Sequence, residues 1–161
     1  MLKKLFLSLA VVCTALSASA ALPSVQLRDI DGKTVDTATL SNDGKPMIIS
    51  FFATWCKPCN RELKNIAEVY DEWQQDTGVR LIAVSIDEGQ NAQKVKPFVE
   101  GKGWEYQVLL DSNSEFKRQM GVNDIPHVFV VDGAGNIVWN HQGYVDGGEE
   151  EVIEAVRACF K

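Results

Sequence analysis

The spacing of apolar residues changes several times along this chain, and the changes predict alternating strands and helices. Residues 25–35 alternate apolar and polar positions around Asp31-Gly32, which is typical of a β-hairpin, and we expect it at an edge of a sheet. Residues 47–53 and 81–86 are almost wholly apolar. Such runs indicate strands that are covered on both faces, as in a parallel or mixed sheet.

Helical spacing follows the first of these buried runs. Apolar residues recur every three or four positions after Cys59, and Gly78 ends the pattern. They are Leu63, Ile66, Ala67, Tyr70 and Trp73. Strand, helix and strand in this order predict a βαβ unit with a right-handed crossover. A second helix is expected to begin near Pro97, a residue suited to a first turn, and to end at Gly101 and Gly103.

The last third of the chain alternates shorter elements. Residues 106–110 predict a strand, residues 115–120 a short helix stopped by Gly121, and residues 127–131 and 137–141 an antiparallel pair. A final helix is indicated by the apolar stripe Val152, Ile153, Val156, Cys159 and Phe160. These patterns together predict an α/β domain whose mixed sheet is flanked by helices.

The first twenty residues have a different character. Lys3 and Lys4 precede an apolar run over residues 5–16, and small residues follow at 18–20, which is the layout of a secretory signal peptide. We expect cleavage after Ala20, export to the periplasm or another extracytoplasmic space, and a folded domain over residues 21–161. An uncleaved membrane anchor is the alternative, although the run is shorter than the roughly 20 residues of a comfortable span.

Composition narrows the class of protein. A chain of 161 residues with 45% hydrophobic and 24% charged residues is a single globular domain rather than a disordered chain. Its net charge is −6 and becomes more negative when the two leading lysines are removed, so a nucleic-acid partner is not expected. We expect a monomer that contacts a membrane only if the leading segment is retained.

Cysteine usage points to thiol chemistry. Of the four cysteines, Cys13 lies in the signal segment and follows Val11-Val12, which are not the small residues of a lipidation site. The remaining three are an odd number, so at least one thiol is unpaired. Cys159 falls on the predicted helical stripe, and we interpret it as a buried small hydrophobe rather than a redox group.

The close pair, Cys56 and Cys59, stands where a buried strand ends and a helix begins. The positive end of the helix dipole stabilises a thiolate at Cys56 and lowers its pKa from about 8.5. Cys59 is one turn further on and can attack a mixed disulfide formed by Cys56. Lys57 adds a cation, and Pro58 is tolerated in a first turn. The pair therefore predicts a redox-active disulfide.

A static disulfide and half of a zinc site are the alternatives. Zinc prefers four ligands, whereas the sequence offers a single CxxC, the lone Cys159, and His127 or His141. No metal and no organic cofactor is expected, because two sulfur atoms carry the electrons.

The stretch that carries the cysteine pair resembles the active site of thioredoxin-like proteins; it is SFFATWCKPCNREL, residues 50–63. Residues 125–132, IPHVFVVD, resemble the segment in which that family carries a cis-proline facing the dithiol, here Pro126, and residues 135–144 continue the match. The leading segment, the hairpin and the extra residues within 81–110 resemble the exported TlpA/ResA subgroup. The resemblance covers residues 22–161 and implies a thioredoxin fold with an N-terminal hairpin and a central insertion.

The resemblance also assigns roles around the dithiol. It implies that Pro126 brings the backbone of Ile125 against the cysteines, where it can pair with an extended substrate chain. Trp55 is expected to shield Cys56 and to form the apolar floor of a substrate groove. The residues of this groove are Trp55, Lys57, Pro58 and Ile125.

One acidic role is open. Ser50 stands where cytoplasmic thioredoxins carry a buried acid, whereas the TlpA/ResA subgroup associates a glutamate after the next strand with its active site. Glu88 occupies a similar position and is our candidate acid or base; the alternative is a solvated carboxylate beside Asp87. His127, which follows Pro126, is either a titrating group or a histidine with no catalytic task.

These observations predict an exported thiol-disulfide oxidoreductase that reduces disulfides in other proteins and draws electrons from an upstream thiol reductant. A thiol peroxidase is one alternative, but peroxiredoxin-like proteins carry Thr-x-x-Cys, and Thr54-Trp55-Cys56 has a different spacing. A module that binds metal or haem proteins without turnover is the other.

Overall fold

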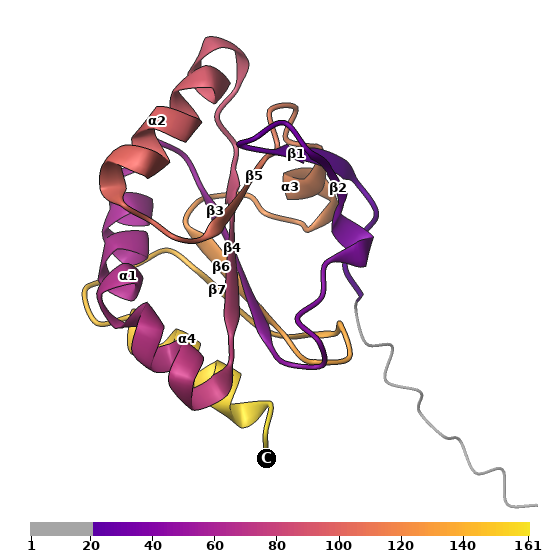
Figure 1. Cartoon of the computed structure of the whole chain (residues 1–161), viewed down its shortest axis with the longest axis vertical. Helices are drawn as coiled ribbons and strands as arrows, with labels where there is room; N and C mark the ends of the chain where they lie inside the picture. The colour runs from indigo at the N-terminus through magenta and orange to yellow at the C-terminus, as the bar shows by residue number, and fades with distance from the viewer. Residues whose placement is uncertain (1–20) are drawn as a thin grey trace, which may run out of the picture.

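A computed structural model describes residues 21–161, so the predicted signal peptide lies outside the described residues. Seven strands form one sheet in the order β2-β1-β5-β4-β3-β6-β7 (Figure 1). The strands are β1 (Gln26–Asp29), β2 (Thr34–Asp36), β3 (Met47–Phe52), β4 (Arg80–Ser85), β5 (Gln107–Leu110), β6 (His127–Val131) and β7 (Ile137–Gln142).

The sheet is mixed, as predicted. β3, β4 and β5 are parallel neighbours, and β6 and β7 continue the sheet with antiparallel pairing. The β1–β2 hairpin turns at Asp31-Gly32, where Gly32 takes a φ of 87° that favours glycine. β1 pairs antiparallel with β5, so the hairpin extends one edge of the sheet. The predicted hairpin and its edge position are confirmed.

Four α-helices cover the two faces of the sheet. They are α1 (Lys57–Thr77), α2 (Ala92–Lys102), α3 (Glu115–Gln119) and α4 (Glu149–Ala158). Figure 1 shows α1, α2 and α4 on one side, and α3 with the hairpin on the other. Two short 3-10 turns, η1 (Thr37–Thr39) and η2 (Gly89–Asn91), complete the connections.

Strand β3 separates two hydrophobic clusters. Ile48 and Phe52 pack on the side of α1, whereas Met47, Ile49 and Phe51 pack on the side of α3. All six β3 residues are buried, which explains why the run in the sequence is apolar at every position but Ser50. This buried strand carries the chain directly to the cysteine pair.

Helix α2 begins earlier than predicted. It starts at Ala92, and Pro97 lies inside it. Pro97 is exposed and lacks the N–H group that would bond to the carbonyl of Gln93, a defect that costs up to about 3 kcal/mol. Val95 and Val99, one turn apart and buried against the core, offset that cost.

Three apolar positions predicted on helical stripes are not fully buried. Helix α4 ends at Ala158, so Phe160 lies beyond it and is exposed, and Cys159 is only half-buried. Ala67 of α1 is exposed as well. The apolar stripe predicted from the sequence extends past the C-terminus of α4, because the helix ends at Ala158.

Candidate active site

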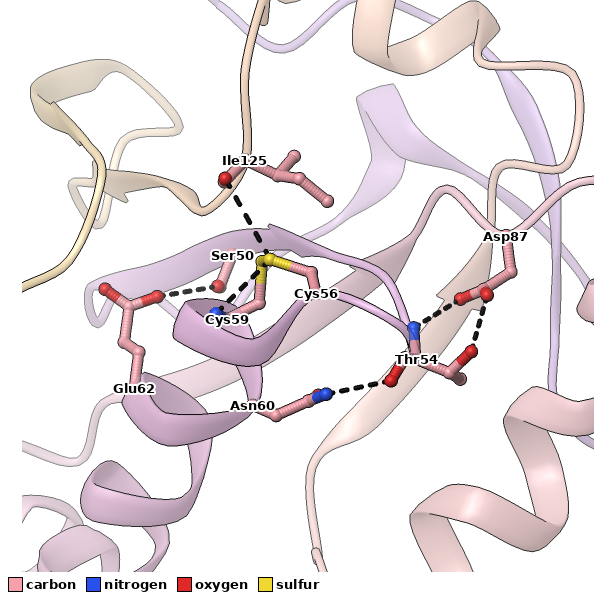
Figure 2. Close-up of a disulfide and its surroundings, with 8 residues drawn as sticks. All are labelled: Ser50, Thr54, Cys56, Cys59, Asn60, Glu62, Asp87 and Ile125. Atoms are coloured by element: carbon pink, nitrogen blue, oxygen red, sulfur yellow. Dashed lines mark hydrogen bonds between the residues drawn. A yellow bond between two sulfur atoms is a disulfide. The ribbon is translucent and has the colours of Figure 1, made fainter.

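The cysteine pair forms a disulfide at the N-terminus of α1, directly after β3. Cys56 is the residue that caps the helix, and its Sγ accepts the backbone N–H of Cys59 at 3.3 Å (Figure 2). Pro58 lies in the first turn, where a missing N–H leaves no bond unmade. The Cys56 sulfur therefore already contacts the N–H group that would stabilise a thiolate.

The two sulfur-bearing residues differ in access. Cys59 is fully buried, whereas 5% of the surface of Cys56 is exposed to solvent. Trp55, Lys57 and Pro58 are exposed around it, and Trp55 is 62% exposed. The pair is therefore accessible from the Cys56 side.

The segment before β6 lies against the disulfide. The Ile125–Pro126 peptide bond is cis, and the Ile125 carbonyl oxygen lies 3.9 Å from Cys56 Sγ (Figure 2). Gly143 donates its N–H to the Pro126 carbonyl at 2.8 Å, which ties the end of β7 to the same segment. The fold thus brings together Cys56, Cys59, Ile125 and Pro126, four of the residues singled out in the sequence.

A buried carboxyl group lies on the inner side of the pair. Glu62, one turn after Cys59, is only 2% exposed. The Ser50 hydroxyl lies 3.5 Å from Glu62 Oε2, and in the view of Figure 2 it stands between that carboxyl group and the disulfide. Burial raises the pKa of Glu62 to about 8; the Ser50 hydroxyl opposes the rise and the charge of Glu149 adds to it. Glu62 therefore holds a proton at neutral pH.

Sequence reasoning missed Glu62, although a signal for it exists. Cys59, Glu62 and Ile66 stand at helical positions i, i+3 and i+7, so the acid interrupts the apolar stripe of α1. A charged residue within a buried stripe indicates a functional group or a paired ion. Ser50 thus takes part in the acidic site through its hydroxyl, and the acid itself comes from the helix.

A second buried carboxylate holds the turn that precedes Cys56. Asp87, the second residue after β4, is 1% exposed. It accepts the Thr54 N–H at 2.8 Å and the Thr54 hydroxyl at 2.6 Å, while Asn60 donates its amide to the Thr54 carbonyl at 2.9 Å (Figure 2). The turn is therefore fastened from both β4 and α1.

The remaining titratable candidates contact other groups. Glu88 accepts a hydrogen bond from the Ser114 hydroxyl at 3.1 Å in an exposed setting, and its catalytic role stays a prediction. His127 is buried, with Nε2 3.1 Å from Asn140 Oδ1 and its ring stacked on Phe129. Its surroundings are those of a packed strand residue.

Cys159 lies far along the chain from this site, at the end of α4. Its Sγ is 3.6 Å from the Ala155 carbonyl, and burial raises the pKa of the thiol, which lowers its reactivity. Within residues 21–161, no three His, Cys, Asp or Glu side chains gather as a metal site.

No helix among the described residues combines the length and apolar character needed to cross a membrane.

Comparison with known proteins gives consistent matches. Residues 18–140 match the model of the AhpC/TSA family. The thiol-disulfide oxidoreductase ResA of Bacillus thuringiensis (strain Al Hakam) is 33% identical over 116 residues, which are 72% of this chain and 64% of that protein. The chain therefore spans just under two thirds of the length of this relative.

Two solved structures share the fold. An uncharacterised thioredoxin-like protein from Porphyromonas gingivalis is 69% identical, with a TM-score of 0.78 over 86% of this chain and 90% of that one. StoA from Bacillus subtilis is 26% identical, with a TM-score of 0.65 over 84% of this chain and 98% of that one. The expected thioredoxin fold is thereby confirmed, and the chain belongs to the AhpC/TSA family of thioredoxin-like proteins.

Proposed function

We propose that this protein is a thiol-disulfide oxidoreductase that reduces disulfides in other proteins. The observation that carries the proposal is the asymmetric pair at the start of α1: Cys56 is reachable and caps the helix, and Cys59 is sealed behind it. The ResA relative bears the name of this activity.

The reaction follows from that asymmetry. In the reduced protein, the Cys56 thiolate attacks one sulfur of a partner disulfide; a mixed disulfide forms and the other partner sulfur leaves as a thiolate that takes a proton. Cys59 then gives up its proton and attacks Cys56 Sγ. The mixed disulfide breaks, the second partner sulfur leaves, and the two electrons of the dithiol have reduced the partner while the Cys56–Cys59 disulfide has formed.

Glu62 is our candidate for the group that exchanges a proton with Cys59; it accepts the proton in its ionised form, which is the minor form at neutral pH. A raised pKa of about 8 puts the carboxyl group near the pKa of a thiol, so a proton can pass between them with little free-energy difference. Glu62 lies one turn from Cys59 and is closed off from solvent, which suits a group that serves the buried sulfur. Glu88 remains a proposed second acid.

The surroundings of Cys56 suit an extended, partly apolar segment of a protein partner. Trp55 is 62% exposed, and Ile125 is half-buried beside the disulfide; Val145, in the loop after β7, is 74% exposed. The Arg61–Asp146 ion pair, 3.3 Å long, holds the loop of Val145 next to α1. We propose that Ile125 backbone groups pair with the partner chain, with Pro126 shaping the turn and Lys57 and Pro58 at the rim of the groove.

The pattern of residues 1–20 supports export: we propose that a signal peptide is cleaved after Ala20 and that the domain acts outside the cytoplasm as a monomer. An exported disulfide reductase needs a thiol reductant to restore its dithiol, and that reductant is its second proposed partner.

Turnover decides between this function and a thiol peroxidase. The Thr54 hydroxyl is occupied by Asp87, which speaks against its use in peroxide chemistry beside Cys56. The test is made of two assays, each with purified protein and dithiothreitol as the reductant. One assay contains a disulfide-bonded protein as substrate, and the other contains hydrogen peroxide. We expect catalytic reduction of the protein disulfide and a reduction potential at or below that of the glutathione couple. Peroxide consumption in its place, or a potential well above that couple, contradicts the proposal.

A further inference from the structure

Asp87 is a buried charged group to which the exchange reaction gives no task. Its carboxylate accepts three hydrogen bonds, two from Thr54 and one from the Ser85 hydroxyl at 2.8 Å. An ionised carboxylate is kept in a protein interior only when such donors replace water. Two of the three donors belong to the residue that stands two positions before Cys56.

Thr54 lies in a tight turn that delivers the chain from β3 to the helix. The Cys56 N–H bonds to the Ala53 carbonyl at 3.0 Å, which closes the turn over Thr54 and Trp55. The Asp87 carboxylate accepts hydrogen bonds from the N–H and the hydroxyl of Thr54, and the Asn60 side-chain amide donates one to the Thr54 carbonyl. Every polar group of Thr54 is thus bound by a residue of β4's exit or of α1, which fixes the conformation of the turn.

This turn sets the direction in which Cys56 points. Cys56 caps α1 with φ −83° and ψ 102°, and its Sγ accepts the Cys59 N–H. Once the disulfide is reduced, a thiolate gains from that N–H and from the helix dipole only while the cap geometry holds, because hydrogen bonds weaken steeply with misalignment.

We propose that Asp87 is a positioning residue which, through Thr54, holds Cys56 in the cap geometry that stabilises its thiolate and so raises the reduction potential of the Cys56–Cys59 pair. Asp87 acts without touching the sulfur in the contacts observed here. The proposal rests on the proposed function in one respect only, namely that the pair is reduced and reoxidised.

The test is Asp87→Asn, which keeps the shape but replaces the charge-assisted hydrogen bonds to Thr54 with weaker neutral ones. We expect the Cys56 thiolate to be destabilised about tenfold, so the pH midpoint of Cys56 alkylation rises by about one unit. At a pH well above the midpoints of both proteins, where Cys56 is ionised in each, the same factor lowers the potential by about 30 mV. The direction is diagnostic: loss of a nearby negative charge alone would lower the midpoint and raise the potential.

Asp111→Asn is a matched control. Asp111 is also buried after a parallel strand and accepts three backbone N–H groups, those of Glu115, Phe116 and Lys117, at distances from 2.7 to 3.2 Å. Its loss should lower stability in urea while both redox readouts stay at the wild-type values. A change in this control equal to that in Asp87→Asn contradicts a specific role for Asp87.

A second pair of variants covers the case in which Asp87→Asn fails to fold. Thr54→Val removes the hydroxyl donor and should shift both readouts in the direction given for Asp87→Asn, whereas Thr54→Ser restores the donor and should rescue them. An unchanged midpoint and potential in folded Asp87→Asn or Thr54→Val, or a shift of the opposite sign, overturns the proposal. Both readouts use the purified protein without a partner, so this failure is distinct from a failure of protein-disulfide turnover.

Discussion

Replacing Glu62 with glutamine should make the oxidised protein less sensitive to alkaline pH. The pKa of Glu62 is about 8 in the folded chain and near its ordinary value of 4.5 when unfolded. Between these values the folded chain holds one more proton than the unfolded chain, so stability falls as pH rises through the window, and this loss reaches its full size above pH 8. At 1.36 kcal/mol per unit, the loss is about 5 kcal/mol, an upper value because the folded structure can relax around the charge.

Urea unfolding of the disulfide form at pH 5, 7 and 9 measures this effect. Glutamine is neutral at all three pH values, so the free energy of unfolding of Glu62→Gln should rise relative to that of the wild type as pH rises. At pH 9 the variant should be the more stable of the two. Glu68→Gln is the control on the same helix, because Glu68 is exposed and pairs only with Lys64 at 3.2 Å. A stability difference between wild type and Glu62→Gln that stays constant with pH refutes the reasoning about burial.

Three further predictions concern the surroundings of the dithiol. Glu149→Gln removes a negative charge that raises the pKa of Glu62, so in the same urea series the total loss of stability should be smaller and should level off at lower pH, and an unchanged profile would show the two groups to be independent. Trp55→Ala should raise KM for a protein disulfide several-fold with little change in potential, measured by steady-state turnover; equal KM values count against a groove at Trp55. Glu88→Gln should alter the pH profile of Cys56 alkylation and the reduction rate, and if both stay at wild type, Glu88 is a surface charge.

The sequence predicts the framework because burial leaves a clear pattern. The apolar run of β3 and the hairpin turn at Gly32 are local signals that the folded structure keeps. The start of α2 was misplaced because Pro97 is a local signal, whereas the helix is held by Val95 and Val99 against a core that forms only in the complete fold. Tertiary packing outweighs the proline defect there.

The site was predictable in its sulfur chemistry and less so in its acids. Motif and helix position identify Cys56 and Cys59, but the burial of Glu62 depends on how α1 faces β3 and α4. Asp87 and Glu88 are neighbours in sequence and differ in space: one is sealed against Thr54, and the other is exposed beside Ser114. Successive side chains of an extended segment point to opposite sides, so only one of Asp87 and Glu88 can face the interior, and sequence alone does not say which.

The central claim is that Cys56 attacks and Cys59 resolves. The most direct measurement expresses Cys59→Ser and Cys56→Ser with residues 1–20 retained, isolates each protein under thiol-blocking conditions, and counts mixed disulfides with other proteins by mass spectrometry. Cys59→Ser should accumulate such complexes, because the helix-capping sulfur of Cys56, the more accessible of the two, still attacks and the resolving sulfur is gone. Cys56→Ser should accumulate few. Equal trapping by the two variants, or faster alkylation of Cys59 than of Cys56 in the reduced wild type, contradicts the assignment.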